Sequence, residues 1–220
     1  MFQSTIVKKY ISTLKEDELI SKWETFKSYF HDSGNQNRIR ELKEEQFQEG
    51  FLKELFVGIF GYIITPNENY NLIPELKNPK DNRKVDGALV FDQVVKCVIE
   101  LKGTNTTDLG KVETQAFSYK NNQPGCEYVV TSNFEKLRFY IGDATAFLEF
   151  NLFELSQDEF NLMYLCLNST NIENNLPKKI KSESLSQEEL ITKVFYKDYS
   201  SFKRELFNNL IELNHEFDKL

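Results

Sequence analysis

Three charged residues stand in two segments whose composition is otherwise that of buried strands. Asp86 lies in residues 84–91, and Glu100 and Lys102 lie in residues 95–102. Both segments are rich in Val, Leu and Ile, which is typical of strands that are buried on both faces. Charges in such strands are costly unless they are paired or bind a metal. We therefore expect these three side chains to have a chemical task.

The register of the two strands decides whether the two carboxylates meet. Residues 92–94 between the strands are few enough for a hairpin loop. A three-residue loop, or a bulge, places Asp86 opposite Glu100 with their Cβ atoms about 5 Å apart, and Lys102 follows on the same face. A regular two-residue loop instead places Asp86 opposite Ile99 and turns Glu100 away.

A facing pair of carboxylates indicates a metal site. The two negative charges repel, so they need a cation between them. Oxygen ligands in a compact site suit Mg²⁺ or Mn²⁺. Such an ion polarises a phosphoryl oxygen and lowers the pKa of a bound water. Lys102 would orient that water or stabilise the charge that develops on the phosphorane. The alternative is an ordinary surface hairpin with a Glu and a Lys.

The segments around this pair alternate between helices and strands. We expect, in order, a helix over 37–60, an edge strand over 70–76, the two charged strands, a helix over 109–120, a strand over 126–131, a hairpin over 137–150 and a helix over 156–167. Asn37 would cap the first helix, and Pro74 fits an edge strand because it cannot donate to a sheet ladder. The αβββαβ order predicts an α/β fold with a mixed sheet.

The charged residues and this order of elements together resemble the PD-(D/E)XK nucleases. After Asp86 come thirteen residues and then Glu100-x-Lys102, with the motif on the second and third strands, where that fold places it. Val85 stands where many members have Pro. The resemblance implies a restriction-endonuclease-like fold with N- and C-terminal helices added, and a metal site that includes the backbone carbonyl of Leu101.

The same resemblance implies further site residues on helices. Many such enzymes place a helical Glu near the metal, and we expect Glu45 first and Glu49 second in that role. In nucleases resembling the RecB group, a Gln and a Tyr with the spacing of Gln115 and Tyr119 border the active site. Residues four apart are neighbours on a helix, so both could position the phosphate or Lys102.

A closer resemblance, over roughly residues 40–155, is to the N-terminal nuclease domain of type IIG restriction–modification enzymes. Four segments carry it: 45–52, 98–104, 115–122 and 128–140. In that family the domain precedes a helical connector and an adenine-N6 methyltransferase with a target-recognition domain, and it cleaves double-stranded DNA with Mg²⁺. Because cutting both strands with one site per chain usually requires two copies, the resemblance also implies transient dimerisation.

The chain lacks the methylase features of that family. It has no Asn-Pro-Pro-Tyr-like motif and no Gly-rich loop for a methyl donor. We therefore expect the N-terminal portion of a longer enzyme, or a stand-alone relative. We divide the chain into an N-terminal helical extension (1–36), the nuclease domain (37–167), and a linker with a helical tail (168–220). A capping box at 186–189 would start that tail, which would be the beginning of the connector.

Composition limits the class of protein. The net charge is −7, but residues 71–140 hold ten Lys and Arg against nine Asp and Glu, so the acidity belongs to the flanking helices. No apolar run reaches 18 residues, which predicts no membrane span. Cys97, Cys126 and Cys166 are isolated in the sequence, which is typical of reduced core thiols in a cytoplasmic protein.

Two other functions stay open at this point. One is a catalytically silent domain of the same fold that serves in DNA binding or assembly. The other is a repair or resolvase nuclease that acts on structured DNA. The retention of Asp86, Glu100 and Lys102 together argues against the silent domain, since each is costly without a task.

Overall fold

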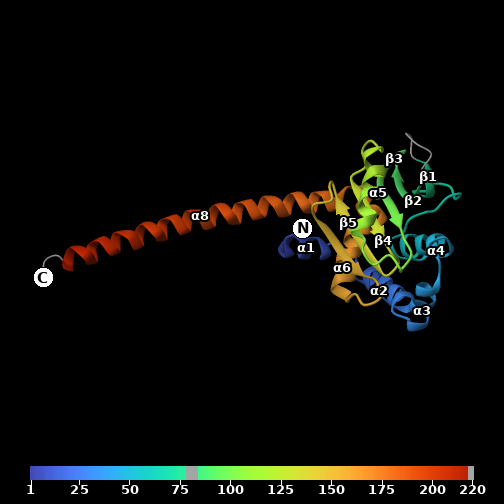
Figure 1. Cartoon of the computed structure of the whole chain (residues 1–220), viewed down its shortest axis with the longest axis horizontal. Coiled ribbons are helices and arrows are strands. Elements are labelled where there is room, and N and C mark those ends of the chain that lie inside the picture. Colours follow the sequence, from blue (N-terminus) through green and yellow to red (C-terminus); the bar gives the residue numbers. More distant parts are fainter. Residues whose placement is uncertain (78–83, 218–220) are drawn as a thin grey trace.

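A computed structural model describes residues 1–77 and 84–217, with side chains described as far as residue 211. A mixed sheet lies inside a body of helices, and one long helix projects from that body (Figure 1). The protein is therefore of the α/β class. The helices are α1 (Ser4–Ile11), α2 (Glu16–Phe30), α3 (Ser33–Glu41), α4 (Glu44–Phe51), the π-helical η1 (Leu52–Ile59), α5 (Gly110–Asn121), α6 (Gln157–Leu167), α7 (Ser169–Glu173) and α8 (Leu176–Phe217).

The sheet has six strands in the linear order β1-β2-β3-β4-β5-β6. Their bounds are β1 (Leu72–Lys77), β2 (Lys84–Phe91), β3 (Val94–Leu101), β4 (Tyr128–Ser132), β5 (Lys136–Ile141) and β6 (Phe147–Asn151). Among the described strands, β3 and β4 pair in parallel, since α5 connects them as a crossover, and the other four strand pairs are antiparallel. The expected αβββαβ order is confirmed, and so is the edge position of the strand that contains Pro74.

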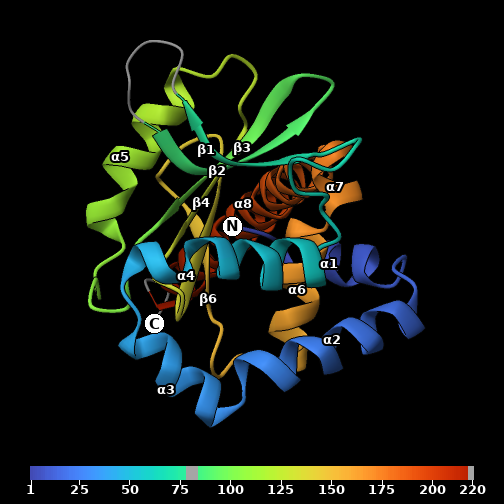
Figure 2. The same ribbon diagram turned by 90° about the vertical axis from the view of Figure 1, so that its right-hand side faces the viewer.

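Helices cover both faces of this sheet. The larger core joins the sheet to α2, α4, η1 and α6 and is rich in Phe, with Phe26, Phe51 and Phe134 fully buried. The smaller core lies under α5, where Ala116 and Tyr119 pack against strand residues. In Figure 2, α5 lies away from α2 and α6. Apolar side chains therefore cover β3 and β4 on both faces, as the sequence predicted for these strands.

The helix expected over 37–60 is divided into three. Asp32, not Asn37, caps the first piece, because its carboxylate accepts a hydrogen bond from the Asn35 amide at 2.7 Å. The chain leaves the helical conformation at Leu42, which is extended (φ −75°, ψ 144°), and re-enters it at Glu44. The break changes which carboxylates of α4 face the sheet.

A bulge, not an odd loop, sets the register of β2 and β3. Phe91 pairs with Val94, so the turn contains only Asp92 and Gln93, and the register shifts between Leu89 and Val90. Beyond the bulge Gly87 pairs with Ile99. Continuing that register places Asp86 opposite Glu100, the arrangement expected for a bulged hairpin.

The two turn residues both have positive φ, 49° at Asp92 and 64° at Gln93. Hairpin turns of this kind favour Asn-Gly, since other side chains are strained there. We expect Asp92→Asn with Gln93→Gly to raise the free energy of unfolding by about 1 kcal/mol, measured by urea denaturation. The control is Gln93→Ala, which keeps the strain. An equal gain from the control would show that the turn conformation is not the cause.

The segment 168–184, expected as a linker, is helical and packed. Asn168 caps α7, and α8 begins at Leu176 with Pro177 in its first turn, where the missing N–H costs nothing. Lys181 donates to the Ile141 carbonyl at 2.7 Å. The expected capping box at 186–189 lies inside α8 and starts no helix. The polar composition of this segment led to the wrong prediction of a linker, because the polar side chains lie on the outer face of a helix that packs on the body.

Candidate functional site

Asp86 and Glu100 lie together at one end of the β2–β3 pair. Both oxygens of Asp86 accept hydrogen bonds, Oδ2 from the Leu101 amide at 2.7 Å and Oδ1 from Gln48 Nε2 at 3.1 Å. Gln48 comes from α4, so the carboxylate of β2 is fixed both by its neighbouring strand and by the helix above it.

Glu100 is the more buried of the two carboxylates. Only 1% of the residue is exposed. Its Oε1 accepts from Lys102 Nζ at 2.9 Å and accepts a short hydrogen bond from Gln115 of α5. Its Oε2 is buried and has no hydrogen-bond partner among the described residues. A buried carboxylate oxygen without a donor is costly, so this atom marks an unfilled acceptor.

Lys102 holds the site together. Its Nζ lies 2.9 Å from Glu100 Oε1 and 3.2 Å from Glu44 Oε1, and it donates to the Leu101 carbonyl at 2.7 Å. Its backbone amide donates to the Ser132 carbonyl at 2.8 Å, which continues the pairing of β3 with β4 beyond the end of β3. The ammonium is thus held at the centre of three oxygen groups.

The site carries an excess of negative charge. Burial, with the nearby charge of Asp86, raises the pKa of the Glu100 carboxyl to about 7. Burial also raises the pKa of the Asp86 carboxyl, although the hydrogen bond from Leu101 opposes it. Burial lowers the pKa of the Lys102 ammonium, but its hydrogen bond to Glu100 and the surrounding carboxylates raise that pKa overall. One ammonium stands among the carboxylates of Asp86, Glu100 and Glu44, so the site favours an additional cation.

The structure brings together most of the site residues expected from the sequence, namely Asp86, Glu100, Leu101, Lys102 and Gln115. Tyr119, the other residue expected from α5, is buried on the same helix. It lies one helical turn beyond Gln115, is 5% exposed, and packs in the smaller core.

Among the described residues, neither of the two helical carboxylates expected at the site contacts Asp86, Glu100 or Lys102. Glu45 is exposed, and Glu49 is exposed and pairs with Lys53 at 2.7 Å. Glu44 takes that place, one residue earlier, and Gln48 lies beside it on the same face. The sequence predicted one helix continuous from residue 37, and Glu44 was therefore not expected on this face. Because the helix instead restarts at Glu44, Glu44 and Gln48, four residues apart, both face the sheet.

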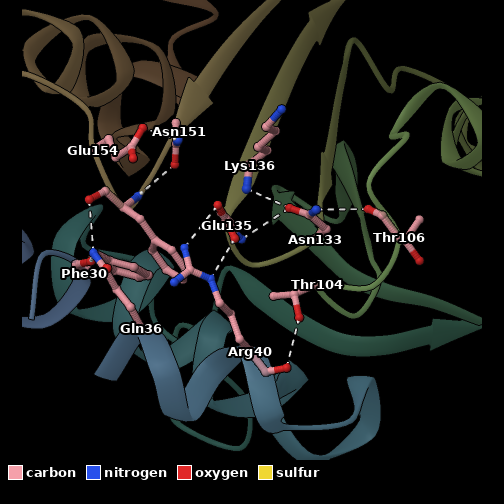
Figure 3. Close-up of polar contacts among 11 residues, drawn as sticks. Phe30, Gln36, Arg40, Thr104, Thr106, Asn133, Glu135, Lys136, Asn151 and Glu154 are labelled. Atoms are coloured by element: carbon pink, nitrogen blue, oxygen red, sulfur yellow. Dashed lines mark hydrogen bonds and ion pairs between the residues drawn. The ribbon is translucent and has the colours of Figure 1, made fainter. Parts of the chain in front are cut away.

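A network of polar contacts fixes the segments that border the site. Figure 3 shows Arg40 of α3 paired with Glu135, at 3.2 Å in its shorter contact. Thr104, in the loop after β3, donates to the Arg40 carbonyl at 3.3 Å, and Asn133 donates to the Thr106 carbonyl at 2.9 Å. These contacts connect the loop 103–107 to the end of α3 and to the turn between β4 and β5.

A polar pocket of about 400 Å³ opens between these segments, directly beside the site. Its lining comes from the break between α3 and α4 and from the loop after β3: Arg40, Glu41, Leu42, Lys43, Glu44, Glu45, Gly103, Thr104 and Asn105. Glu44 belongs both to the pocket and to the site. A ligand that reaches Lys102 could therefore extend into this pocket.

The donor set fits a hard divalent cation with an incomplete protein shell. Within residues 1–77 and 84–217, no group of three or more His, Cys, Asp or Glu side chains is arranged to hold a metal ion. Two carboxylates and one carbonyl oxygen, from Asp86, Glu100 and Leu101, nevertheless lie together there, and Glu100 Oε2 accepts no hydrogen bond from the described residues. Mg²⁺ commonly uses only one or two carboxylates and completes its octahedron with water and phosphate oxygens.

Comparisons with known proteins identify no relative. No family model, no curated protein and no solved structure matches the chain.

Among the described residues, no helix combines the length and the apolar character that crossing a membrane requires. Cys97, Cys126 and Cys166 are all buried free thiols, which confirms their expected place in the core.

Proposed function

We propose that the chain is a metal-dependent endonuclease domain that hydrolyses phosphodiester bonds of double-stranded DNA. The observation that carries the proposal is the buried Glu100 carboxylate, whose Oε2 has no donor among the residues that the structure describes and stands beside Asp86, the Leu101 carbonyl and Lys102. A buried anion with an open oxygen is costly in a purely structural role. It is explained if a divalent cation binds there.

Each residue then has a task. Asp86 and Glu100 would hold the ion with the Leu101 carbonyl, and when bound the ion supplies Lewis-acid activation of the phosphoryl group and a more acidic water. Gln115 holds Oε1 of Glu100, which leaves Oε2 for the cation. The Lys102 ammonium would orient the attacking water and stabilise the negative charge that develops on the phosphoryl oxygens. Hydrolysis would cleave one P–O bond, with the water's hydroxyl bonding to phosphorus and its other proton passing to the leaving oxygen.

We further infer that this is a PD-(D/E)XK fold and the cleavage module of a type IIG restriction–modification enzyme. The element order and the facing of Asp86 with Glu100 support the fold, and the four resembling segments support the enzyme class. On this proposal, the methyltransferase and target-recognition region belong to the same longer polypeptide. Recognition of a DNA sequence lies in that region.

One observation favours a second candidate, a catalytically silent assembly domain. The Lys102 ammonium contacts Glu100, Glu44 and the Leu101 carbonyl at once, so it already neutralises part of the charge that would hold a metal. In that case the cluster is a buried ion-pair network, and a divalent cation has no place in it.

Cleavage of a supercoiled plasmid separates the two candidates. We expect the chain, or the chain joined to its methyltransferase region, to nick or linearise the plasmid only with Mg²⁺ or Mn²⁺. Glu100→Ala and Lys102→Ala should each lower the rate about a thousandfold. Glu49→Ala, on the same helix as Glu44 but exposed, is the matched control and should keep the wild-type rate. Equal cleavage by all four proteins would refute the site, and no cleavage by either wild-type form would support the silent domain.

A further inference from the structure

The outer part of α8 is an apolar helix without a described partner. The helix packs on the body through residues as far as Gln187, whose side chain accepts a hydrogen bond from Thr5 at 2.9 Å. Beyond it, the hydrogen bonds and ring contacts described for the helix stay within the helix, as between Phe195 and Tyr199. Figure 1 shows this part projecting away from the body.

Six large apolar residues form a stripe along this part of the helix, and each is between 48% and 63% exposed: Ile191, Phe195, Tyr199, Phe202, Leu206 and Leu210. Their intervals are four, four, three, four and four residues. This is the spacing of an eleven-residue helical repeat, which keeps one face of a helix against another helix. Exposed apolar patches of this size mark interaction sites. A helix that projects alone into water is marginally stable, and packing its apolar face against a partner is what stabilises it.

The charges beside the stripe indicate what covers it. Asp198 and Lys203 are exposed, five residues apart, on opposite flanks of the stripe. In a parallel pair of helices in register, residues five apart on opposite flanks meet across the interface, as the e and g positions of coiled coils do. A second copy would therefore bring each Asp198 to a Lys203. An antiparallel pair would bring Asp198 beside Glu205, a like charge.

The area is also sufficient. A large aromatic or aliphatic side chain buries on the order of 200 Å². With each stripe residue about half exposed, two copies would bury roughly 1,200 Å², the lower limit of specific interfaces. Three other exposed apolar side chains flank the stripe and would add to this area: Val194, Tyr196 and Phe207.

We infer that α8 pairs two copies of this chain in parallel through the stripe from Ile191 to Leu210. The two bodies then lie at the same end of the paired helices. The inference stands apart from the proposed cleavage activity, because none of its residues belongs to the site.

Cross-linking of the full chain tests the pairing and its direction. Leu206→Cys places a thiol on the stripe, where a parallel pair brings the two copies' position 206 within disulfide distance. Asn208→Cys, two residues away on the opposite face, is the matched control, and the buried native cysteines do not compete. Mild oxidation should give a covalent dimer with Leu206→Cys and at least tenfold less with Asn208→Cys. Equal amounts, or a wild-type chain that sediments as a monomer at about 50 µM, would overturn the inference.

Charge exchange tests the register. Asp198→Lys or Lys203→Asp alone turns two attractions per dimer into two repulsions, so each should weaken dimerisation about tenfold or more by sedimentation equilibrium. Combining both changes in one chain should restore the wild-type affinity to within about threefold. Failure of the double variant to recover would show that these residues do not meet, and the parallel register would be wrong.

Discussion

Glu100→Gln should make the folded chain more stable at pH 8 by about 3 kcal/mol while abolishing metal-dependent cleavage. The pKa of Glu100 is raised to about 7, above the usual value for a glutamate, so the folded state binds more protons than the unfolded state between about pH 4.5 and 7. Stability contributed by the protonated form is therefore fully present below about pH 4.5 and is lost as the pH rises to about 7. Gln imitates the protonated form at every pH.

Urea denaturation at pH 4.5 and pH 8 measures this difference. The two proteins should be nearly equal at pH 4.5 and should separate by pH 8. Adding Mg²⁺ at pH 8 should stabilise the wild-type chain and leave Glu100→Gln unchanged, because a bound ion replaces the missing partner of the carboxylate. A pH-independent difference between the proteins would show that Glu100 titrates normally, and equal stabilisation by Mg²⁺ would place the metal elsewhere.

Glu44→Gln should lower the rate of cleavage by about 10- to 100-fold, although the sequence favours Glu45 and Glu49 as the helical carboxylates. Glu44 lies 3.2 Å from Lys102 Nζ and close to Gln48, so it orients two side chains that contact the carboxylate pair. Losses of this size are typical when groups that support metal ligands are removed. Glu49→Gln, at an exposed position on the same helix, should keep the wild-type rate.

A second readout separates this role from simple damage to the fold. The charge of Glu44 contributes to the raised pKa of Glu100. Glu44→Gln should therefore lower the pKa of the Glu100 carboxyl, seen by carboxyl NMR titration, whereas Glu49→Gln should leave it in place. If both variants shift the titration equally, the effect is long-range and Glu44 has no special position.

Much of the site was predictable because it depends on local spacing. The apolar character of β2 and β3 and the short connection between them limited the register to a few choices, and one of these put Asp86 opposite Glu100. The choice itself was not predictable, since a bulge at Leu89 and Val90 depends on packing around the strands. The i, i+4 spacing of Gln115 and Tyr119 was visible, but whether Tyr119 faces the site or the core depends on where α5 lies on the sheet.

The errors lie where the backbone leaves regular structure. The apolar periodicity over residues 37–60 does not reveal the break at Leu42. The sequence therefore could not predict that Glu44 faces the site. In the tail, the polar residues 168–184 have the composition of a linker, yet Ile180 is fully buried against the body. A few anchoring side chains are enough to dock a helix whose outer face is polar.

The two outer strands of the sheet affect how the protein behaves at high concentration. β1 carries Pro74, which has no N–H to donate, and Glu75, whose φ of 50° interrupts the regular ladder. β6 is only five residues long and ends at Asn151. Such short or interrupted edges resist the strand-to-strand joining that leads to aggregation. Two bodies held side by side by α8 would therefore stay separate folded units and would not merge into a continuous sheet.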